Sequence, residues 1–139
     1  TPRRGERGTW ITAEIRQAYT RLHSMGIAHS VEAWDADQLV GGVYGVNVDG
    51  AFAAESMFYR QENASKLALL HLIDHLAGAG LDWLDIQVLT PHLARLGAKA
   101  IDRELFMRKL RRTRARGLRV FDAIARMPLD LCSEKSDID

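Results

Sequence analysis

The sequence has 139 residues, of which 47% are apolar and 27% charged, with a formal net charge of +1; these values fit one globular domain and exclude a disordered or fibrous chain. A single cysteine, Cys132, excludes an intramolecular disulfide and a cysteine metal cluster, and the lack of a long apolar run or signal peptide predicts a cytoplasmic protein. The charge is uneven, since residues 103–119 hold 8 basic side chains and 1 acidic one, which predicts either a polyanion-binding surface or a solvated helix face.

The first half of the sequence predicts one helix followed by three strands. Apolar residues recur at helical spacing after Thr12, which can cap the helix, until Gly26 ends it. Alternating and apolar segments then predict strands, and Asp49-Gly50 is a strong hairpin signal before the third of them. The strands form an antiparallel meander and cover residues 29–34, 39–48 and 51–58.

The second half predicts three helices and one more strand. Asn63-Ala64-Ser65-Lys66 begins a helix of about 16 to 18 residues that ends at Gly78 or Gly80 and crosses the sheet. Leu84–Leu89 alternates between apolar and polar residues and predicts a fourth strand. The remaining elements are a short helix over 91–96, a final helix from about Asp102 that carries the basic block, and a frayed end after Pro128.

This order of elements predicts an α+β domain in which helices pack on one mixed sheet. It matches the architecture of acyl-transferase domains of the N-acetyltransferase (GNAT) type, a likeness of fold that by itself carries no function. We expect residues 1–8 to be a loose lead-in, residues 9–110 to form the domain, and residues 111–139 to hold the end of the basic helix and a polar tail.

Three polar side chains on two predicted strands are candidates for catalysis. Asp85 and Gln87 are two residues apart, so in a strand they project from the same face, where a carboxylate could take a proton and an amide could orient a substrate. Glu55 lies in an otherwise apolar strand, and a buried acid there needs a partner or a shifted pKa. A structural hydrogen-bonded pair is the alternative reading of Asp85 and Gln87.

Two adjacent glycines, Gly41 and Gly42, interrupt the second strand and indicate a bulge or the close approach of another backbone or a ligand. The apolar residues around them form either a side-chain pocket or plain core: Val43, Tyr44, Phe52, Met57 and Leu72.

The helix that begins near Lys66 has an N-terminus able to hold an anion, although capping by Asn63 or Ser65 explains the same residues. The glycine-rich turn that a coenzyme A site needs is absent from this position, which argues against an ordinary acetyltransferase. Further along, His71-Leu72-Ile73-Asp74-His75 resembles a metalloprotease pattern with Asp in place of Glu, and we expect no metal there.

Many ordered motifs together resemble the leucyl/phenylalanyl-tRNA–protein transferases over about residues 8–110. They are Gly8-Thr9-Trp10-Ile11-Thr12, Ala18-Tyr19, Leu22-His23, Gly26, Ala28-His29-Ser30-Val31-Glu32, Trp34, Leu39-Val40-Gly41-Gly42, Tyr44-Gly45, Glu55-Ser56-Met57-Phe58, Asn63-Ala64-Ser65-Lys66, Asp85-x-Gln87-Val88, His92-Leu93, Leu96-Gly97-Ala98 and Arg103.

The resemblance implies a bacterial cytoplasmic enzyme that moves Leu or Phe from the 3′ end of aminoacyl-tRNA onto the N-terminal Arg or Lys of an acceptor protein, marking it for degradation. Aminoacyl-tRNA replaces acetyl-coenzyme A on a GNAT-like fold, so no cofactor is expected. The sequence resembles a short form of the family that lacks its N-terminal domain.

The resemblance also assigns roles by position. Asp85 and Gln87 match the family's catalytic Asp-x-Gln pair, and Glu55 matches the acid that helps to hold the acceptor amine. Residues for the pocket of the Leu or Phe side chain are Gly41, Gly42, Val43, Phe52, Met57, Leu72 and Leu84. Val43 stands where Met is common in the family and Leu72 where Phe is common, which affects the preferred amino acid. The candidates for tRNA phosphate contact are Lys66, Arg108, Lys109, Arg111 and Arg112.

Two other functions are compatible with these residues. One is a module that binds tRNA or a protein N-terminus without catalysing transfer. The other is a related aminoacyl-tRNA-dependent transferase with a different donor or acceptor. Asp85, Gln87 and Glu55 favour an enzyme, because binding alone does not require them.

Overall fold

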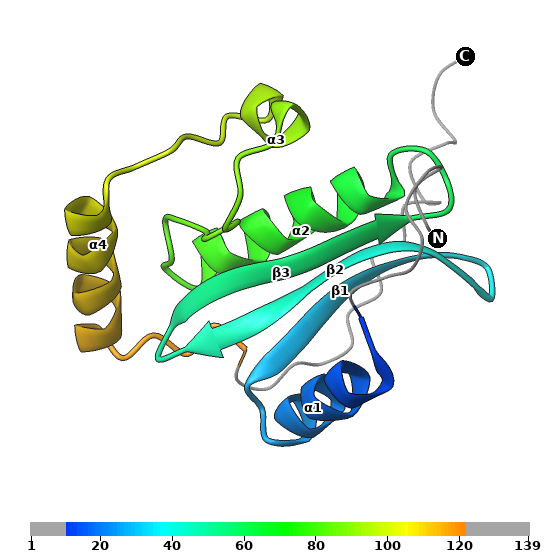
Figure 1. Ribbon diagram of the computed structural model, residues 1–139, viewed down its shortest axis with the longest axis horizontal. Helices are drawn as coiled ribbons and strands as arrows, with labels where there is room; N and C mark the ends of the chain where they lie inside the picture. The colour runs from blue at the N-terminus through cyan, green and yellow to red at the C-terminus, as the bar shows by residue number, and fades with distance from the viewer. Residues whose placement is uncertain (1–10, 122–139) are drawn as a thin grey trace, which may run out of the picture.

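The computed structural model describes residues 11–121 (Figure 1). The predicted lead-in at residues 1–8, the frayed end after Pro128 and Cys132 lie outside the described residues. The elements follow one another as α1 (Ala13–Ser24), β1 (Ala28–Asp35), β2 (Gln38–Val48), β3 (Ala51–Tyr59), α2 (Ala64–Gly78), α3 (Pro91–Arg95) and α4 (Arg103–Ala115).

Polar side chains begin three of the helices. Thr12 caps α1, where its hydroxyl accepts a hydrogen bond from the backbone N–H of Ile15, as the sequence predicts. Thr90 does the same at α3, and the carboxylate of Asp102 accepts from Leu105 N–H at 2.8 Å to begin α4. At α2, Asn63 has a left-handed backbone and its side chain makes no capping bond, so the suggested capping by Asn63 is wrong.

The sheet confirms the predicted meander, with antiparallel strands in the order β1-β2-β3. The predicted strand at Leu84–Leu89 is wrong. Only Asp85 pairs with β3, in a parallel bridge to Ala53, while Gln87 has a φ of 63° and Val88 is 68% exposed. The Asp85 carboxylate accepts a hydrogen bond from the backbone N–H of Gln87, which turns the chain away from the sheet. The described chain is therefore α+β with a three-stranded antiparallel sheet rather than the expected mixed one.

The sheet separates α1 from α2, as Figure 1 shows. On the α2 side, Val43, Phe52 and Leu72 belong to a buried core that α2, the sheet and the chain after α4 build together. On the α1 side, the ring of Tyr19 packs edge-on against Tyr44, which is adjacent to Val43 in β2 and therefore faces the other way. The two faces of the sheet are thus packed differently: α2 covers the buried core on one face, and α1 packs on the other through Tyr19.

The start of α2 lies directly on β2 at Gly41. A Cβ atom at this position would lie 2.6 Å from the Cβ of Ala64 and 2.8 Å from the backbone nitrogen of Ser65, so only glycine fits. Next to it, Val40 is an extra residue in β2, because Ala33 pairs with Gly41 and Trp34 with Leu39. Both expectations for the glycine pair, a bulge and a close backbone approach, are confirmed here.

A few specific contacts fasten α4 to the rest of the molecule. The indole N–H of Trp83 donates to the hydroxyl of buried Thr113 at 2.8 Å, and the Trp83 ring packs edge-on against Phe106. Arg114 forms an ion pair with Asp49 at 2.9 Å, although both side chains are largely exposed. The indole therefore orients the helix, and the ion pair adds little to stability.

Histidines hold the chain that follows α4. Phe121 stacks on His29 and His75, and His75 Nε2 donates to the carbonyl of Val120 at 2.5 Å. His29 Nε2 donates to the carbonyl of Gly26, while its buried Nδ1 has no hydrogen-bond partner in the described part of the chain. Burial lowers the pKa of His29; the hydrogen bond with Gly26 opposes this, and the neighbouring His23 and His75 lower the pKa further, so neutral imidazole is favoured.

Replacement of Gly41 by alanine is expected to destabilise the fold by about 1–3 kcal/mol, because α2 would have to move off β2. Urea denaturation measures this change. Gly78→Ala is the matched control: nothing lies within 4 Å of an added Cβ there, and alanine in a helix is expected to be neutral or to stabilise by up to about 1 kcal/mol. Equal stability of the two variants would contradict the close approach.

The free energy of unfolding is expected to fall as the pH drops below about 6.5, the ordinary pKa of histidine. Below that pH the unfolded chain binds a proton that folded His29 binds less readily, so protonation favours unfolding. Urea denaturation at about pH 7.5 and 5.5 tests this. His29→Gln keeps a donor for Gly26 and does not titrate, so it should flatten the dependence; an unchanged dependence would refute the role of His29.

Candidate active site

Glu55 is the extra residue of a bulge between β2 and β3. Tyr44 pairs with Ser56 and Gly45 pairs with Ala54, which leaves Glu55 without an opposite residue. A bulge bends a strand and redirects the side chain at that point. Gly45 is required at this position, since a Cβ there would meet the carbonyl oxygen of Ala53 at 2.0 Å. The half-buried acid is thus presented by a specific backbone irregularity rather than by a regular strand.

Two tyrosines lie beside Glu55 on the α1 side of the sheet. Burial raises the pKa of Tyr19, and the charge and hydrogen bond of the Glu55 carboxylate raise it further. Burial likewise raises the pKa of Tyr44, with added effects of Tyr19 and Glu55. No local sequence pattern predicts either tyrosine at this acid, because Tyr19 reaches it only through the packing of α1 on the sheet.

Asp85 lies at the edge of β3 near Glu55. Its backbone N–H donates to the carbonyl of Phe52 at 3.2 Å and its carbonyl accepts from Ala54 N–H at 2.8 Å, so it is fixed beside Ala53. Ala53 and Glu55 are two residues apart, which is roughly 7 Å along a strand. The pairing also places Asp85 on the sheet face of Ala53, the same face as Tyr44. The structure therefore brings the two predicted carboxylates to one edge.

The expected geometry of Asp85 and Gln87 is wrong in one respect. The two residues do not project from a common strand face, because the chain leaves the strand conformation after Asp85 and Gln87 is left-handed. Instead, Asp85 Oδ1 accepts a hydrogen bond from Gln87 N–H at 2.9 Å. The carboxylate consequently fixes the turn that carries the exposed Gln87 side chain. A carboxylate, an amide and the Glu55 acid can together orient an amine and accept a proton.

Five of the predicted pocket residues form one apolar cluster under α2. Val43, Phe52 and Leu72 are each 1–2% exposed, and Met57 and Leu84 pack against them. Neither glycine lies against this cluster. The start of α2 occupies the space at Gly41, and a Cβ on Gly42 would meet Phe58 and the carbonyl of Val31. The role of the cluster as a pocket for a substrate side chain stays a prediction.

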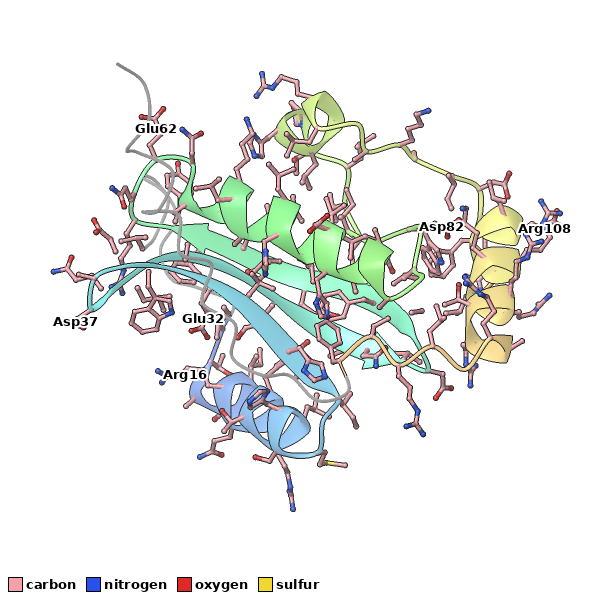
Figure 2. All side chains as sticks on the ribbon, turned by 180° about the vertical axis from the view of Figure 1, so that it is seen from behind. Arg16, Glu32, Asp37, Glu62, Asp82 and Arg108 are labelled. Carbon is pink, nitrogen blue, oxygen red and sulfur yellow. The ribbon has the colours of Figure 1, made fainter. Side chains whose placement is uncertain are left out.

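The predicted phosphate contacts fall on two helices. Lys66 is half-buried in the first turn of α2. On α4, the exposed residues Arg108, Arg111 and Arg112 have the spacing of one helix face, with half-buried Lys109 beside them. Figure 2 shows Arg108 pointing away from the rest of the molecule. The basic face of α4 is therefore open to a partner.

In the described range 11–121, no group of three or more His, Cys, Asp or Glu side chains could hold a metal ion, and no helix has the length and apolar character needed to cross a membrane. His75 of the metalloprotease-like pattern is engaged with the Val120 carbonyl and the Phe121 ring.

Comparison with known proteins adds independent information. The family model for leucyl/phenylalanyl-tRNA protein transferase matches residues 1–111. A curated leucyl/phenylalanyl-tRNA–protein transferase of Pelodictyon phaeoclathratiforme is 52% identical over 109 residues, which cover 78% of this chain and 56% of the relative. Those of Shewanella frigidimarina and Magnetococcus marinus are 52% and 53% identical, over 83% and 77% of this chain and 49% and 48% of their own lengths. The chain spans about half the length of these relatives.

Proposed function

Because the chain belongs to the leucyl/phenylalanyl-tRNA–protein transferase family, we propose that it transfers Leu or Phe from aminoacyl-tRNA to the N-terminus of an acceptor protein. The observation that supports this function best is the placement of Asp85, which fixes the turn of Gln87, beside Ala53, two residues before Glu55 in β3. Three separate backbone features produce that placement: a bulge, a parallel bridge and an Asp-stabilised turn.

In the proposed reaction, the α-amine of the acceptor attacks the ester carbonyl of the aminoacyl-tRNA. A C–N bond forms, the ester C–O bond breaks, and the departing 3′ oxygen of the tRNA receives a proton in exchange for the one that the amine loses. Glu55 holds the amine, while Asp85 fixes the turn and so positions Gln87 at the reacting carbonyl. The ester is already activated, so orientation supplies much of the catalysis and no cofactor is needed.

We assign the apolar cluster beneath α2 to the Leu or Phe side chain of the donor. Val43, Phe52, Met57, Leu72 and Leu84 would supply its walls, with Gly41 and Gly42 at the adjoining stretch of β2. This cluster is closely packed in the present structure, so binding would require side chains such as Met57, which is flexible and half-buried, to move. The acceptor would carry an N-terminal Arg or Lys, and the product would be a bacterial cytoplasmic protein marked for degradation.

The phosphates of the tRNA would lie on the basic face of α4, with Lys66 as a further contact. Arg108, Arg111 and Arg112 are exposed on one side of that helix, opposite the contact between Thr113 and Trp83. Lys109 lies at the border of this face. Basic side chains at helical spacing neutralise phosphates without reading sequence, which suits a donor whose amino acid decides specificity.

We further propose that residues 9–110 belong to a GNAT-like transferase domain. An antiparallel meander with a bulge at the reacting edge, a helix crossing one face, and a parallel pairing at Asp85 support this fold. The boundary at residue 110 falls inside α4, so residues 111–115 continue that helix.

Asp85→Ala and Gln87→Ala are each expected to reduce transfer about 100-fold or more, because both remove part of the orienting group. The assay follows radiolabelled Leu or Phe from charged tRNA to a protein that begins with Arg or Lys. Asp82→Ala is the control, since this exposed acid lies three residues before Asp85 and outside the site. Transfer at the wild-type rate by either folded variant would refute the assignment. Binding of charged tRNA without product in the wild-type chain would indicate a binding module instead.

Removal of Arg108, Arg111 and Arg112 together is expected to weaken binding of charged tRNA and to reduce its salt slope by about 2 to 3. Filter binding at several KCl concentrations measures both values. The control removes two exposed arginines, Arg16 and Arg21, from α1, where no tRNA contact is proposed. A salt slope equal to that of the wild-type chain would place the phosphate contacts elsewhere.

A further inference from the structure

We propose that Tyr19 is a positioning residue, whose phenol donates a hydrogen bond to the Glu55 carboxylate and holds that acid in the orientation that receives the acceptor amine. The inference rests on the proposed function for the role of Glu55, but the contact can be tested without transfer activity. The helix α1, which has no residue of the buried core, thereby contributes to the site.

The bulge makes such a support necessary. Glu55 has no opposite residue in β2, because Ser56 and Ala54 take the pairings on either side of it. A residue in a bulge lacks the cross-strand neighbour that would restrict its side chain in a regular strand. An acid that must meet an amine in one orientation therefore needs a contact from outside the β2–β3 pair.

Tyr19 is placed to make that contact. Its ring centroid lies 5.2 Å from that of Tyr44 at an interplanar angle of 74°, an edge-on packing that fixes the phenol over the α1 side of the sheet. Tyr44 pairs with Ser56, the residue next to Glu55, so the ring contact directs Tyr19 to the bulge. Tyr44 thus acts as the platform on which Tyr19 rests.

Electrostatics agree with this arrangement. Burial is the largest cause that raises the pKa of Tyr19, and the charge of the Glu55 carboxylate and its acceptance of a hydrogen bond raise it further. The pKa of Tyr44 is also raised, chiefly by burial and then by Tyr19 and Glu55, while a hydrogen bond with Ser56 opposes the rise. A carboxylate has two oxygens, so a Glu55 that accepts from Tyr19 with one of them would keep the other for the amine.

Tyr19→Phe tests the role, because it keeps the ring contact with Tyr44 and removes only the hydroxyl. We expect kcat/KM for the acceptor to fall about tenfold, with KM for charged tRNA and the unfolding midpoint unchanged. Tyr59→Phe is the matched control, since Tyr59 is 64% exposed at the end of β3. An acceptor kcat/KM equal to that of the wild type would overturn the proposal.

A second measurement separates this proposal from the proposed function. The chain has 3 tyrosines, so NMR titration of the labelled phenol carbons can follow each one. Glu55→Gln should lower the pKa of Tyr19 and leave that of Tyr59 unchanged. If Tyr19 titrates alike in both proteins, the contact is refuted whatever the activity. If the coupling is present but the wild-type chain makes no product, the proposed function fails and the support of Glu55 by Tyr19 stands.

Discussion

The direct contact of α2 with β2 at Gly41 determines the depth at which the helix lies, and much of the structure follows from that depth. With Ala64 and Ser65 against the strand backbone, the inner face of α2 reaches the sheet over its whole length and brings Leu72 and Leu76 into the core. The end of the helix then fixes where the chain returns to the sheet. Leu81 is buried at that return, and Asp85 reaches β3 four residues later. The position of Asp85 beside β3 therefore depends on Gly41 of β2, which has no side chain.

The second constraint is the mismatch in length between β2 and β3. One extra residue in β3 separates the pairings of Tyr44 and Gly45, and that residue is Glu55. A regular strand would have given the acid a fixed place in the alternation of faces. The bulge instead leaves it to be supported, as we propose, by the phenol of Tyr19, whose ring packs on Tyr44 from α1.

Local sequence signals predicted the elements well where the signal and the structure are both local. Thr12, Gly26 and Asp49-Gly50 mark the ends of helix and strands because capping and turn formation involve only a few neighbouring residues. The predicted strand at 84–89 was wrong because alternation cannot show where the chain turns: after Asp85 pairs with β3, its carboxylate accepts from Gln87 N–H and ends the extended segment. Asp85, Gln87 and Glu55 could be singled out from polarity in apolar surroundings. Tyr19 could not, since nothing in the sequence shows which face of the sheet α1 covers.

The indole of Trp83 joins two parts of the molecule that otherwise share few contacts. It is hydrogen-bonded to Thr113 in the last turn of α4, and it precedes Asp85 by two residues. Trp83 thus connects α4 directly to the segment that pairs with β3. A displacement of α4 near Thr113 would therefore reach the backbone two residues before Asp85 through this indole, in addition to acting on Asp49 through the ion pair of Arg114.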